Sequence, residues 1–283
     1  MLGVLVAGWL LASGGVSPDT AVDLRRGDAV IVENLTGSVE VAVWERSTLS
    51  VEGVGPVARG VAVRREGGRV VVEPGDRKGR GLAVALRLHV PAWAALEIRG
   101  RELDVSVSGA AAGVSVRTVD GDIVVTGASG ALTLSTIDGD VEVRDARGIV
   151  SARSRGGDVV LARVEGEKVE VESGSGDLRM EEVTSPSVHA QTLDGDVFFQ
   201  GPLASGGTYW FSTHAGDADV IVPAQAGARV RVSTFDGEFA SDFPVTLQRY
   251  GGGGVFDFSI GDGGASLEIQ AFDGEIRLRS GGR

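Results

Sequence analysis

The sequence predicts an all-β fold in which a single chain winds into a parallel β-solenoid with coils of about 18–21 residues. Three observations lead to this prediction. A short phrase, an apolar residue followed by Asp-Gly-Asp or a close variant, returns along most of the chain. Short segments of alternating apolar and polar residues separate its copies, and Val dominates their apolar positions, which favours strands. No stretch keeps the 3.6-residue apolar period of an amphipathic helix.

The copies of the phrase are evenly spaced. Their central glycines follow one another at steps of 18 to 21 residues, and a final step of 37 residues is two periods long. A fixed period near twenty indicates a repeat array in which each unit stacks on the next. The glycines of the phrase are Gly121, Gly139, Gly157, Gly176, Gly195, Gly216, Gly237 and Gly274.

Composition excludes several classes of protein. The chain has 283 residues and a formal net charge of −12, so it lacks the basic surface that nucleic acid requires. It contains no Cys, and therefore no disulfide framework and no thiolate site. The 44 glycines and the 5% of aromatic residues indicate many turns and few large core side chains. A hydrophobic content of 42% argues against disorder.

Residues 1–14 are predicted to be a signal peptide. Leu2 to Ala12 form an apolar run, and Ala12-Ser13-Gly14 is the small-residue pattern of a cleavage site. The run is shorter than the ~20 residues that span a bilayer, so we expect no stable membrane span after cleavage. No Lys or Arg precedes the run, which leaves open whether it is cleaved; a buried first strand is the alternative. We therefore expect an extracytoplasmic location: periplasmic, secreted or at the cell surface.

Residues 15–113 are predicted to form an all-β part that leads into the solenoid. The basic segment from Pro74 to Gly81 interrupts its strands and is interpreted as a solvated loop. The predicted strands are 29–33, 38–44, 48–52, 61–65, 69–73, 82–90, 95–99 and 103–108.

Residues 114–283 are predicted to be the repeat solenoid, with two strands in each period. One strand follows the phrase, as in 140–144, and the other follows a second turn, as in 149–153. Alternation places Val141 and Val143 inside with Val150, while their neighbours face water.

The last third of this region is expected to be irregular and to cap the array. By alternation Tyr209 and Phe211 belong to the core, whereas Trp210 is exposed. Tyr250 to Gly254 are interpreted as a flexible insertion that interrupts the repeat.

Size decides between two topologies. Asp-Gly between strands also suits antiparallel hairpins, but some twenty strands in one meander would exceed the ~10 strands that open sheets usually hold. Stacked parallel coils have no such limit. The short period indicates a narrow, flattened or rounded-triangle cross-section, and crossover chirality leads us to expect a right-handed winding.

In-register stacking would align the acids of the phrase in columns. Rungs ~4.8 Å apart would cost ~0.9 kcal/mol of repulsion per pair in water, which an exposed edge tolerates. Asp and Gly are residues that tight corners favour, so a structural role is the preferred interpretation. Ca²⁺ binding stays open as the alternative. The acids concerned are Asp120, Asp122, Asp138, Asp140, Asp194 and Asp196.

No catalytic, cofactor-binding or metal-binding residue is assigned, and the protein is predicted not to be an enzyme. A glycosidase would need one distinct pair of carboxylates, yet the acids here form the repeat itself. The three histidines, His89, His189 and His214, lie far apart in the sequence, and no nucleophile-elbow motif accompanies them. They are interpreted as exposed strand residues.

The chain resembles the bacterial "putative adhesin" family, a domain of unknown function found in exported proteins. The resemblance rests on Val39 to Trp44 after Thr36-Gly37, on Leu88 to Pro91 leading into Leu96 to Ile98, and on the repeated phrase. It implies a β-solenoid and an extracytoplasmic location, and it brings no catalytic residues.

The leading hypothesis is thus a non-catalytic scaffold or binding surface at the cell envelope, whose partner, a protein or a polysaccharide, is unknown. The alternatives are a β-helix protein that binds or cleaves polysaccharide, and a Ca²⁺-stabilised adhesin. A hydrolase should show two carboxylates flanking a groove lined by Trp210 or Tyr250, whereas a scaffold should show flat faces.

Overall fold

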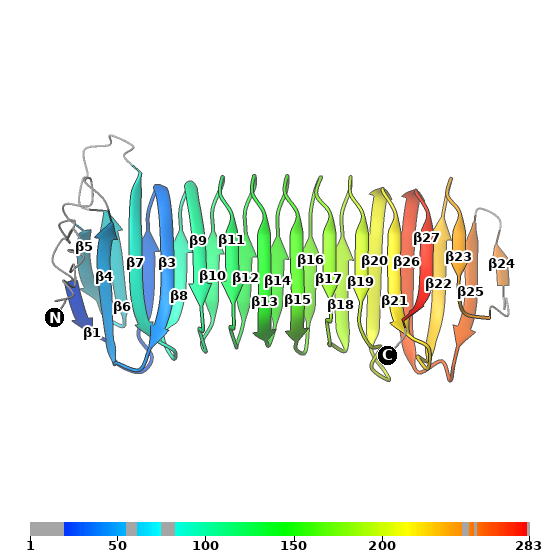
Figure 1. Ribbon diagram of the computed structural model, residues 1–283, viewed down its shortest axis with the longest axis horizontal. Coiled ribbons are helices and arrows are strands. Elements are labelled where there is room, and N and C mark those ends of the chain that lie inside the picture. Colours follow the sequence, from blue (N-terminus) through cyan, green and yellow to red (C-terminus); the bar gives the residue numbers. More distant parts are fainter. Residues whose placement is uncertain (1–19, 55–60, 75–82, 245–248, 252–253, 282–283) are drawn as a thin grey trace, which may run out of the picture.

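Two long sheets make up the described part of the chain, and no helix accompanies them (Figure 1). The computed structural model describes residues 20–54, 61–74, 83–244, 249–251 and 254–281. One sheet, called sheet A, has 13 strands, and the other, sheet B, has 14. Along the middle of the molecule each coil gives one strand to each sheet, so the cross-section is flattened. The predicted all-β parallel solenoid is confirmed. The described residues include no helix that could span a membrane.

The middle of the solenoid stacks its coils in the order of the sequence. Neighbouring strands of this part are one period apart in the sequence and pair in parallel; Val141, for example, is in register with Ile123 and with Val159. In sheet B these strands are β8 (Ala95–Arg99), β10 (Val114–Arg117), β12 (Leu132–Ser135), β14 (Val150–Arg153), β16 (Val169–Glu172), β18 (Ser187–Gln191) and β20 (Thr208–Ala215). In sheet A they are β9 (Glu102–Ser108), β11 (Ile123–Thr126), β13 (Val141–Arg147), β15 (Val159–Glu165), β17 (Leu178–Glu181), β19 (Val197–Gln200) and β21 (Ala218–Pro223).

The N-terminal end departs from the order of the sequence. The coil of β6 and β7 stacks on the outer side of the coil of β2 and β3, and the chain then returns so that β8 and β9 stack on the inner side. Antiparallel pairing of β4 with β7, and of β5 with β6, closes this end. The strands are β1 (Thr20–Asp23), β2 (Ala29–Glu33), β3 (Thr36–Trp44), β4 (Thr48–Val54), β5 (Val61–Glu66), β6 (Arg69–Pro74) and β7 (Val84–Pro91).

The C-terminal end is reordered in the same way. The last coil in the sequence, β26 with β27, lies between the coil of β20 and β21 and the coil of β22 and β23. The 37-residue step between Gly237 and Gly274 therefore reflects a coil inserted out of order, not two periods in line. The strands are β22 (Ala228–Thr234), β23 (Phe239–Ser241), β24 (Arg249–Gly251), β25 (Val255–Ile260), β26 (Ala265–Asp273) and β27 (Ile276–Gly281).

Three predicted segments fall wholly or partly outside the described residues. The signal peptide at 1–14 and residues 75–81 of the basic loop lie outside them. The proposed insertion at 250–254 is described in part: Tyr250 and Gly251 belong to β24, which pairs antiparallel with β25. This part of the segment is thus a strand that closes sheet B, and interpreting it as a plain insertion was wrong.

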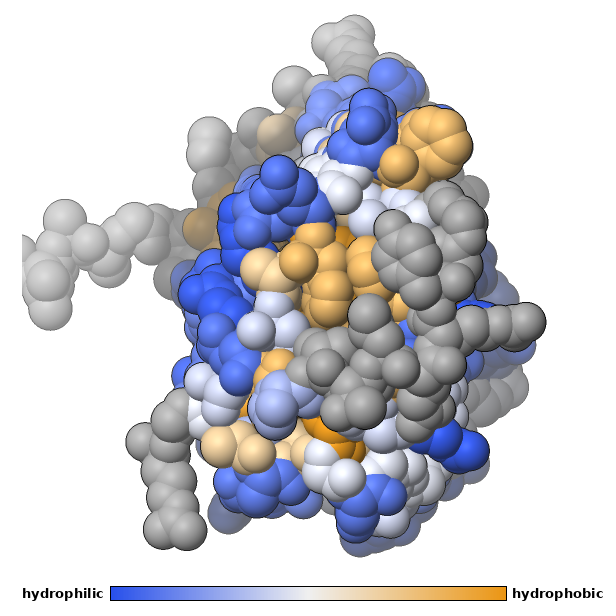
Figure 2. All heavy atoms as spheres, turned by 90° about the vertical axis from the view of Figure 1, so that its right-hand side faces the viewer, coloured by the Kyte–Doolittle hydropathy of each residue, from blue (hydrophilic) through white to orange (hydrophobic). Residues whose placement is uncertain are grey.

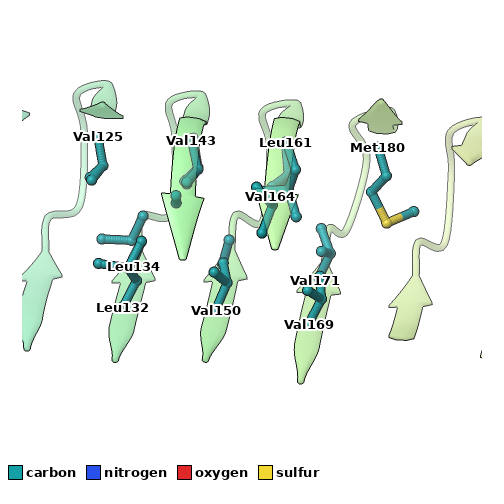
Figure 3. Packing of buried hydrophobic residues seen from close by; sticks show 14 of the residues in the cluster. Val125, Leu132, Leu134, Val143, Val150, Leu161, Val164, Val169, Val171 and Met180 are labelled. Carbon is teal, nitrogen blue, oxygen red and sulfur yellow. The ribbon is translucent and has the colours of Figure 1, made fainter. Parts of the chain in front are cut away.

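The core is one continuous layer between the two sheets (Figure 3). Val143 and Leu161 point inward from sheet A and meet Leu134 and Val150 from sheet B, and all four are buried. The inward parity predicted for the repeat is confirmed at these positions. Each fully buried aliphatic side chain contributes roughly 2 kcal/mol of hydrophobic stabilisation. Because the layer runs across every coil, no coil has a core of its own.

Candidate functional site

From β10 onward, the repeated phrase forms one corner of each coil, where the chain passes from a strand of sheet B to the next strand of sheet A. Between β12 and β13, for example, the corner runs from Thr136 to Asp140. Equivalent corner residues of successive coils lie above one another and form columns along the solenoid axis. We call this edge the Asp-Gly corner. Four of its columns, named by their distance from the glycine, are described below.

The glycine column is required by the close approach of stacked backbones. A Cβ built on Gly139 would lie 2.2 Å from the carbonyl oxygen of Gly121. Gly121 itself has a φ of +133°, which disfavours any other residue. The glycine of the phrase is thus a consequence of coil stacking and needs no functional explanation.

The aspartates that follow the glycines connect each coil to the next. The backbone N–H of Asp140 donates to Oδ1 of Asp122 at 2.9 Å, and that of Asp158 donates to Oδ1 of Asp140 at 2.8 Å. The predicted column is therefore present, and its carboxylates accept backbone hydrogen bonds. The acceptors in stacking order are Asp104, Asp122, Asp140, Asp158, Asp177, Asp196 and Asp217, and the last donor is Glu275.

The aspartates that precede the glycines form a second, exposed column. Asp120 and Asp138 bridge in parallel, and Asp194 bridges to Ala215 two coils before the C-terminal end. No group of three or more His, Cys, Asp or Glu residues that could hold a metal ion occurs among the described residues. The aspartates that follow the glycines thus accept hydrogen bonds from the next coil, and those that precede the glycines lie on the surface.

A buried hydroxyl column, which sequence reasoning missed, lies three residues before the glycines. Ser154 Oγ donates to the carbonyl oxygen of Gly139 at 2.8 Å, and Thr192 Oγ1 donates to that of Gly176 at 2.9 Å. The signal was present in the sequence, because every glycine of the phrase from Gly121 to Gly237 has Ser or Thr at this position. The members are Thr118, Thr136, Ser154, Ser173, Thr192, Thr213 and Thr234, all buried.

An exposed apolar column lies two residues before the glycines. It holds six of the eight large hydrophobic side chains that are exposed among the described residues, with exposed fractions of 37–72%. Five of these residues belong to the repeated phrase, and no role was predicted for them. They are Leu35, Val119, Ile137, Leu193, Phe235 and Phe272.

The aromatic residues of β20 lie as alternation predicts. Tyr209 and Phe211 are buried, while Trp210 lies on the outer face of sheet B, stacked on His189 at 4.2 Å. The Tyr209 hydroxyl donates to the Ser185 carbonyl at 2.7 Å, and burial raises the pKa of this phenol. Tyr209 is thus a core residue whose polar atom is satisfied.

The three histidines are not brought together into a catalytic arrangement. His189 and His214 belong to β18 and β20 of sheet B, whereas His89 lies in β7 of sheet A. Each stacks on an aromatic ring; His89 packs on Trp44 at 5.2 Å between ring centroids. Within the described ranges, none of the three forms a side-chain hydrogen bond with Ser or Asp.

A shallow hollow of about 290 Å³ lies on sheet A beside the Asp-Gly corner. Its wall includes Phe198, with the Arg179 guanidinium 4.5 Å from the ring centroid, and several ladder aspartates. Asp177 and Asp196 are exposed, and Asp217 is 3.4 Å from Arg277. A glycosidase acid needs a carboxyl in apolar surroundings, which these acids lack. Neither Trp210 nor Tyr250 lines this hollow, and the Tyr250 side chain is outside the described atoms.

A family model described as Toastrack DUF4097 matches residues 108–279. No curated protein matches the chain.

Among the solved structures that are similar to this chain, three have sequence identities of 8–12% and TM-scores of 0.35–0.48. A "putative adhesin" from Parabacteroides distasonis is 8% identical, with 94% of this chain and 98% of that chain covered and a TM-score of 0.48. A "putative adhesin" from Parabacteroides merdae is 11% identical, with 94% and 97% covered and a TM-score of 0.35. A "putative lipid binding protein" from Parabacteroides distasonis is 12% identical, with 94% and 97% covered and a TM-score of 0.36.

Proposed function

Because this chain belongs to the Toastrack DUF4097 family, we propose that it is a non-catalytic, extracytoplasmic β-solenoid that acts as a scaffold or binding surface at the cell envelope. One observation carries this proposal. The strands of each sheet pair in register over many coils, so equivalent outward side chains line up along the solenoid axis. The molecule therefore has two long faces of regularly spaced side chains. Repeat proteins use such extended surfaces for binding.

The arrangement of acids supports a non-catalytic role. The most regular carboxylates of the chain accept backbone N–H groups of the next coil, as Asp140 does from Asp158 at 2.8 Å. A carboxylate engaged in this way holds the fold together. The described hollow on sheet A offers no carboxyl in apolar surroundings that could act as a general acid.

The sequence supports the extracytoplasmic part of the proposal. Residues 2–12 are apolar, and the small residues of a cleavage site follow them. A fusion of the full chain to a reporter that is active only outside the cytoplasm tests this part. We expect reporter activity with the whole chain and its loss when residues 2–14 are deleted. Equal activity of both fusions, or none from either, would contradict the proposed location.

Binding and turnover are tested together on isolated envelope material. The purified protein is mixed with envelope polysaccharide and, separately, with envelope proteins, and both co-sedimentation and release of reducing sugar ends are measured. We expect saturable binding to one fraction without release of new ends. Release of ends that grows with protein concentration would establish a polysaccharide-cleaving enzyme instead. Absence of saturable binding to both fractions would overturn the binding role.

A further inference from the structure

Near its C-terminal end, the apolar column of the Asp-Gly corner becomes a continuous ridge of exposed side chains. In stacking order the ridge consists of Leu193, His214, Phe272 and Phe235, and we call it the corner ridge. The rings of His214 and Phe272 stack at 4.7 Å, and those of Phe272 and Phe235 stack at 4.7 Å with 6° between their planes. Figure 2, viewed onto this end of the molecule, shows hydrophobic residues on the end face with hydrophilic residues beside them, most clearly on the left.

The ridge has no role in the core. Phe235 is 71% exposed and Phe272 is 43% exposed, although the inward positions of the same coils are filled by other side chains. Large apolar residues placed next to one another on a surface mark interaction sites more often than scattered ones do. Phe is also among the residues enriched in the buried centres of protein interfaces.

Two columns of carboxylates follow the ridge along each corner and border it on one side. Asp194, Asp273 and Asp236 are exposed directly beside it, and no ion pair engages them within the described residues. The ladder acids lie beyond them on the same side, after the glycine column: Asp196, Asp217, Glu275 and Glu238. Arg277 is paired with two of these, Asp217 and Glu275. The ridge is thus an apolar strip with a strongly negative border along one side.

The negative charge of this border favours some ligands of the ridge over others. A second copy of the chain, packed ridge to ridge, would bring the same carboxylates together, and an anionic lipid surface would be repelled by them. Sugar rings pack on open aromatic faces, but the ridge rings cover one another's faces along the stack. A protein segment that carries basic and apolar side chains fits both the strip and its border.

We propose that the corner ridge binds a segment of a partner protein in which Lys or Arg side chains alternate with apolar side chains. The inference rests on the proposed role of the solenoid as a binding surface and specifies the partner. Apolar side chains of the segment pack on Leu193 and the Phe rings, and its cations pair with the flanking aspartates. A guanidinium over the last ring, Phe235, adds a cation–π contact.

The test uses a labelled peptide of about eight residues that alternates Lys with Leu, a length that covers the four coils at about 3.3 Å per residue. Binding to the full chain is measured by fluorescence anisotropy. Matched peptides replace Lys by Glu, or Leu by Ser. We expect the Lys-Leu peptide to bind, and its affinity to fall with added salt because ion pairs contribute. The two matched peptides should bind at least about tenfold more weakly.

Variants locate the site. Phe235→Ser with Phe272→Ser should weaken the Lys-Leu peptide by about tenfold or more, and Asp194→Asn with Asp273→Asn should weaken it and reduce the salt dependence. Ile149→Ser is the matched control, because Ile149 is 45% exposed and lies on the opposite edge, between β13 and β14. It should leave affinity unchanged. All the substituted side chains are exposed, so thermal unfolding should confirm that the variants fold.

Five results would overturn the inference. Two concern the peptide: no preference for the Lys-Leu sequence, or an equal loss of affinity in the Ile149 control. Two would reveal another occupant: sedimentation of the protein with zwitterionic vesicles, or formation of a dimer, if the Phe variant abolishes it. The fifth, binding of the Phe variant to envelope fractions with wild-type affinity, would reject the ridge but leave the proposed function intact. Loss of the proposed function would instead appear as no envelope binding by the wild type.

Discussion

The middle of the solenoid and its C-terminal end use the same corner but different connections. Between β10 and β19, the hydrogen bonds of the ladder aspartates join residues one period apart, such as Asp140 and Asp122, which are 18 residues apart. At the end, Asp217 Oδ1 accepts the N–H of Glu275, 58 residues away, because the coil of β26 and β27 is inserted out of order. Local repetition thus builds the middle, and a long-range return closes the end.

The hydroxyl column shows what this return changes. From Thr136 to Thr213 every hydroxyl of the column donates to a glycine carbonyl, but the inserted coil carries Ala271 in register with Thr213 and Thr234. Within the described structure, Thr234 Oγ1 is buried without a hydrogen-bond partner. The end of the array is therefore built from less regular corners than the middle.

Deleting a whole coil should separate the two regions most strongly. Removing residues 265–281 takes out a coil that lies inside the stack, so β22 to β25 lose the strands on which they pack. We expect residues 224–264 to become sensitive to protease and the protein to aggregate through exposed strand edges. Mass spectrometry of limited proteolysis products measures the effect.

The matched control removes one period from the middle. Deleting residues 141–158 joins Asp140 to Val159 and keeps both the phrase and the register of the neighbouring strands. This variant should stay folded and monomeric, with a lower unfolding temperature. If the two deletions increased protease sensitivity and aggregation equally, the order of the coils at the C-terminal end would have no special importance for stability.

Replacing a corner glycine in the middle should have the next largest effect. In Gly139→Ala the new Cβ meets the Gly121 carbonyl oxygen at 2.2 Å, and neither backbone can move without its coil, so we expect a loss of about 3 kcal/mol. Gly206→Ala is the control: its φ is +76°, but no atom lies within 4 Å of the added Cβ. It should cost only about 1 kcal/mol. Urea unfolding measures both, and equal losses would exclude stacking as the cause.

Removing a corner hydroxyl should have opposite outcomes in the two regions. Thr192→Val deletes a buried hydrogen bond of 2.9 Å to the Gly176 carbonyl and should cost about 1–2 kcal/mol. Thr234→Val removes a buried hydroxyl that lacks a partner, so it should be neutral or stabilising. Both substitutions preserve shape. The comparison of the two unfolding free energies is the measurement, and a larger loss at Thr234 would contradict the irregular end.

The N-terminal end should respond to acid. The backbone N–H of Arg25 and the side chain of Arg65 donate to Asp28 at 2.8 Å and hold the pKa of this carboxyl below its usual value. Because the pKa of Asp28 is lower in the folded state than in the unfolded chain, ionised Asp28 stabilises the fold at any pH above its unfolded-state pKa. This stabilisation is lost as the pH falls through the folded-state pKa. Asp28→Asn should therefore be less stable than wild type at pH 7, with a difference that shrinks in acid. Unfolding free energies are measured across this pH range. A difference between Asp28→Asn and wild type that does not change with pH would exclude the linkage. Asp236→Asn is the control at an exposed position.

Calcium should have the smallest effect. Each ladder aspartate already uses Oδ1 to accept a backbone N–H, and the exposed acids are spaced along the axis with no cluster of three at the described positions. We expect the unfolding temperature in EDTA and in millimolar Ca²⁺ to be the same. A rise with Ca²⁺ would show binding to the folded state and favour a Ca²⁺-stabilised adhesin.

The repeat could be predicted from the sequence because stacked coils require glycine at the corner and apolar residues at the inward strand positions. The inward positions of Val141 and Val143 and the column of Asp122 and Asp140 follow directly from the period. The order of coils at both ends could not be predicted, since each coil presents the same alternation and any of them would fit beside any other. The 37-residue step was the remaining signal of the inserted coil.

The site was predicted less completely than the fold. The column of Asp140 was expected, but its hydrogen bond depends on the distance from Oδ1 to the next backbone N–H, which only coordinates give. Phe235 and Phe272 were overlooked because alternation assigns apolar residues to the core. At a corner the backbone leaves the extended conformation, so alternation no longer determines which way a side chain points.

The inserted coil also determines when the molecule can be completed. During synthesis the middle coils emerge in the order in which they stack, so each one finds its partner already present. Residues 224–264 emerge before the coil that lies beneath them, and they must wait for residues 265–281. A chain that ends before residue 265 therefore lacks the coil that joins β20 and β21 to β22 and β23. Its C-terminal end stays incomplete until residues 265–281 are present.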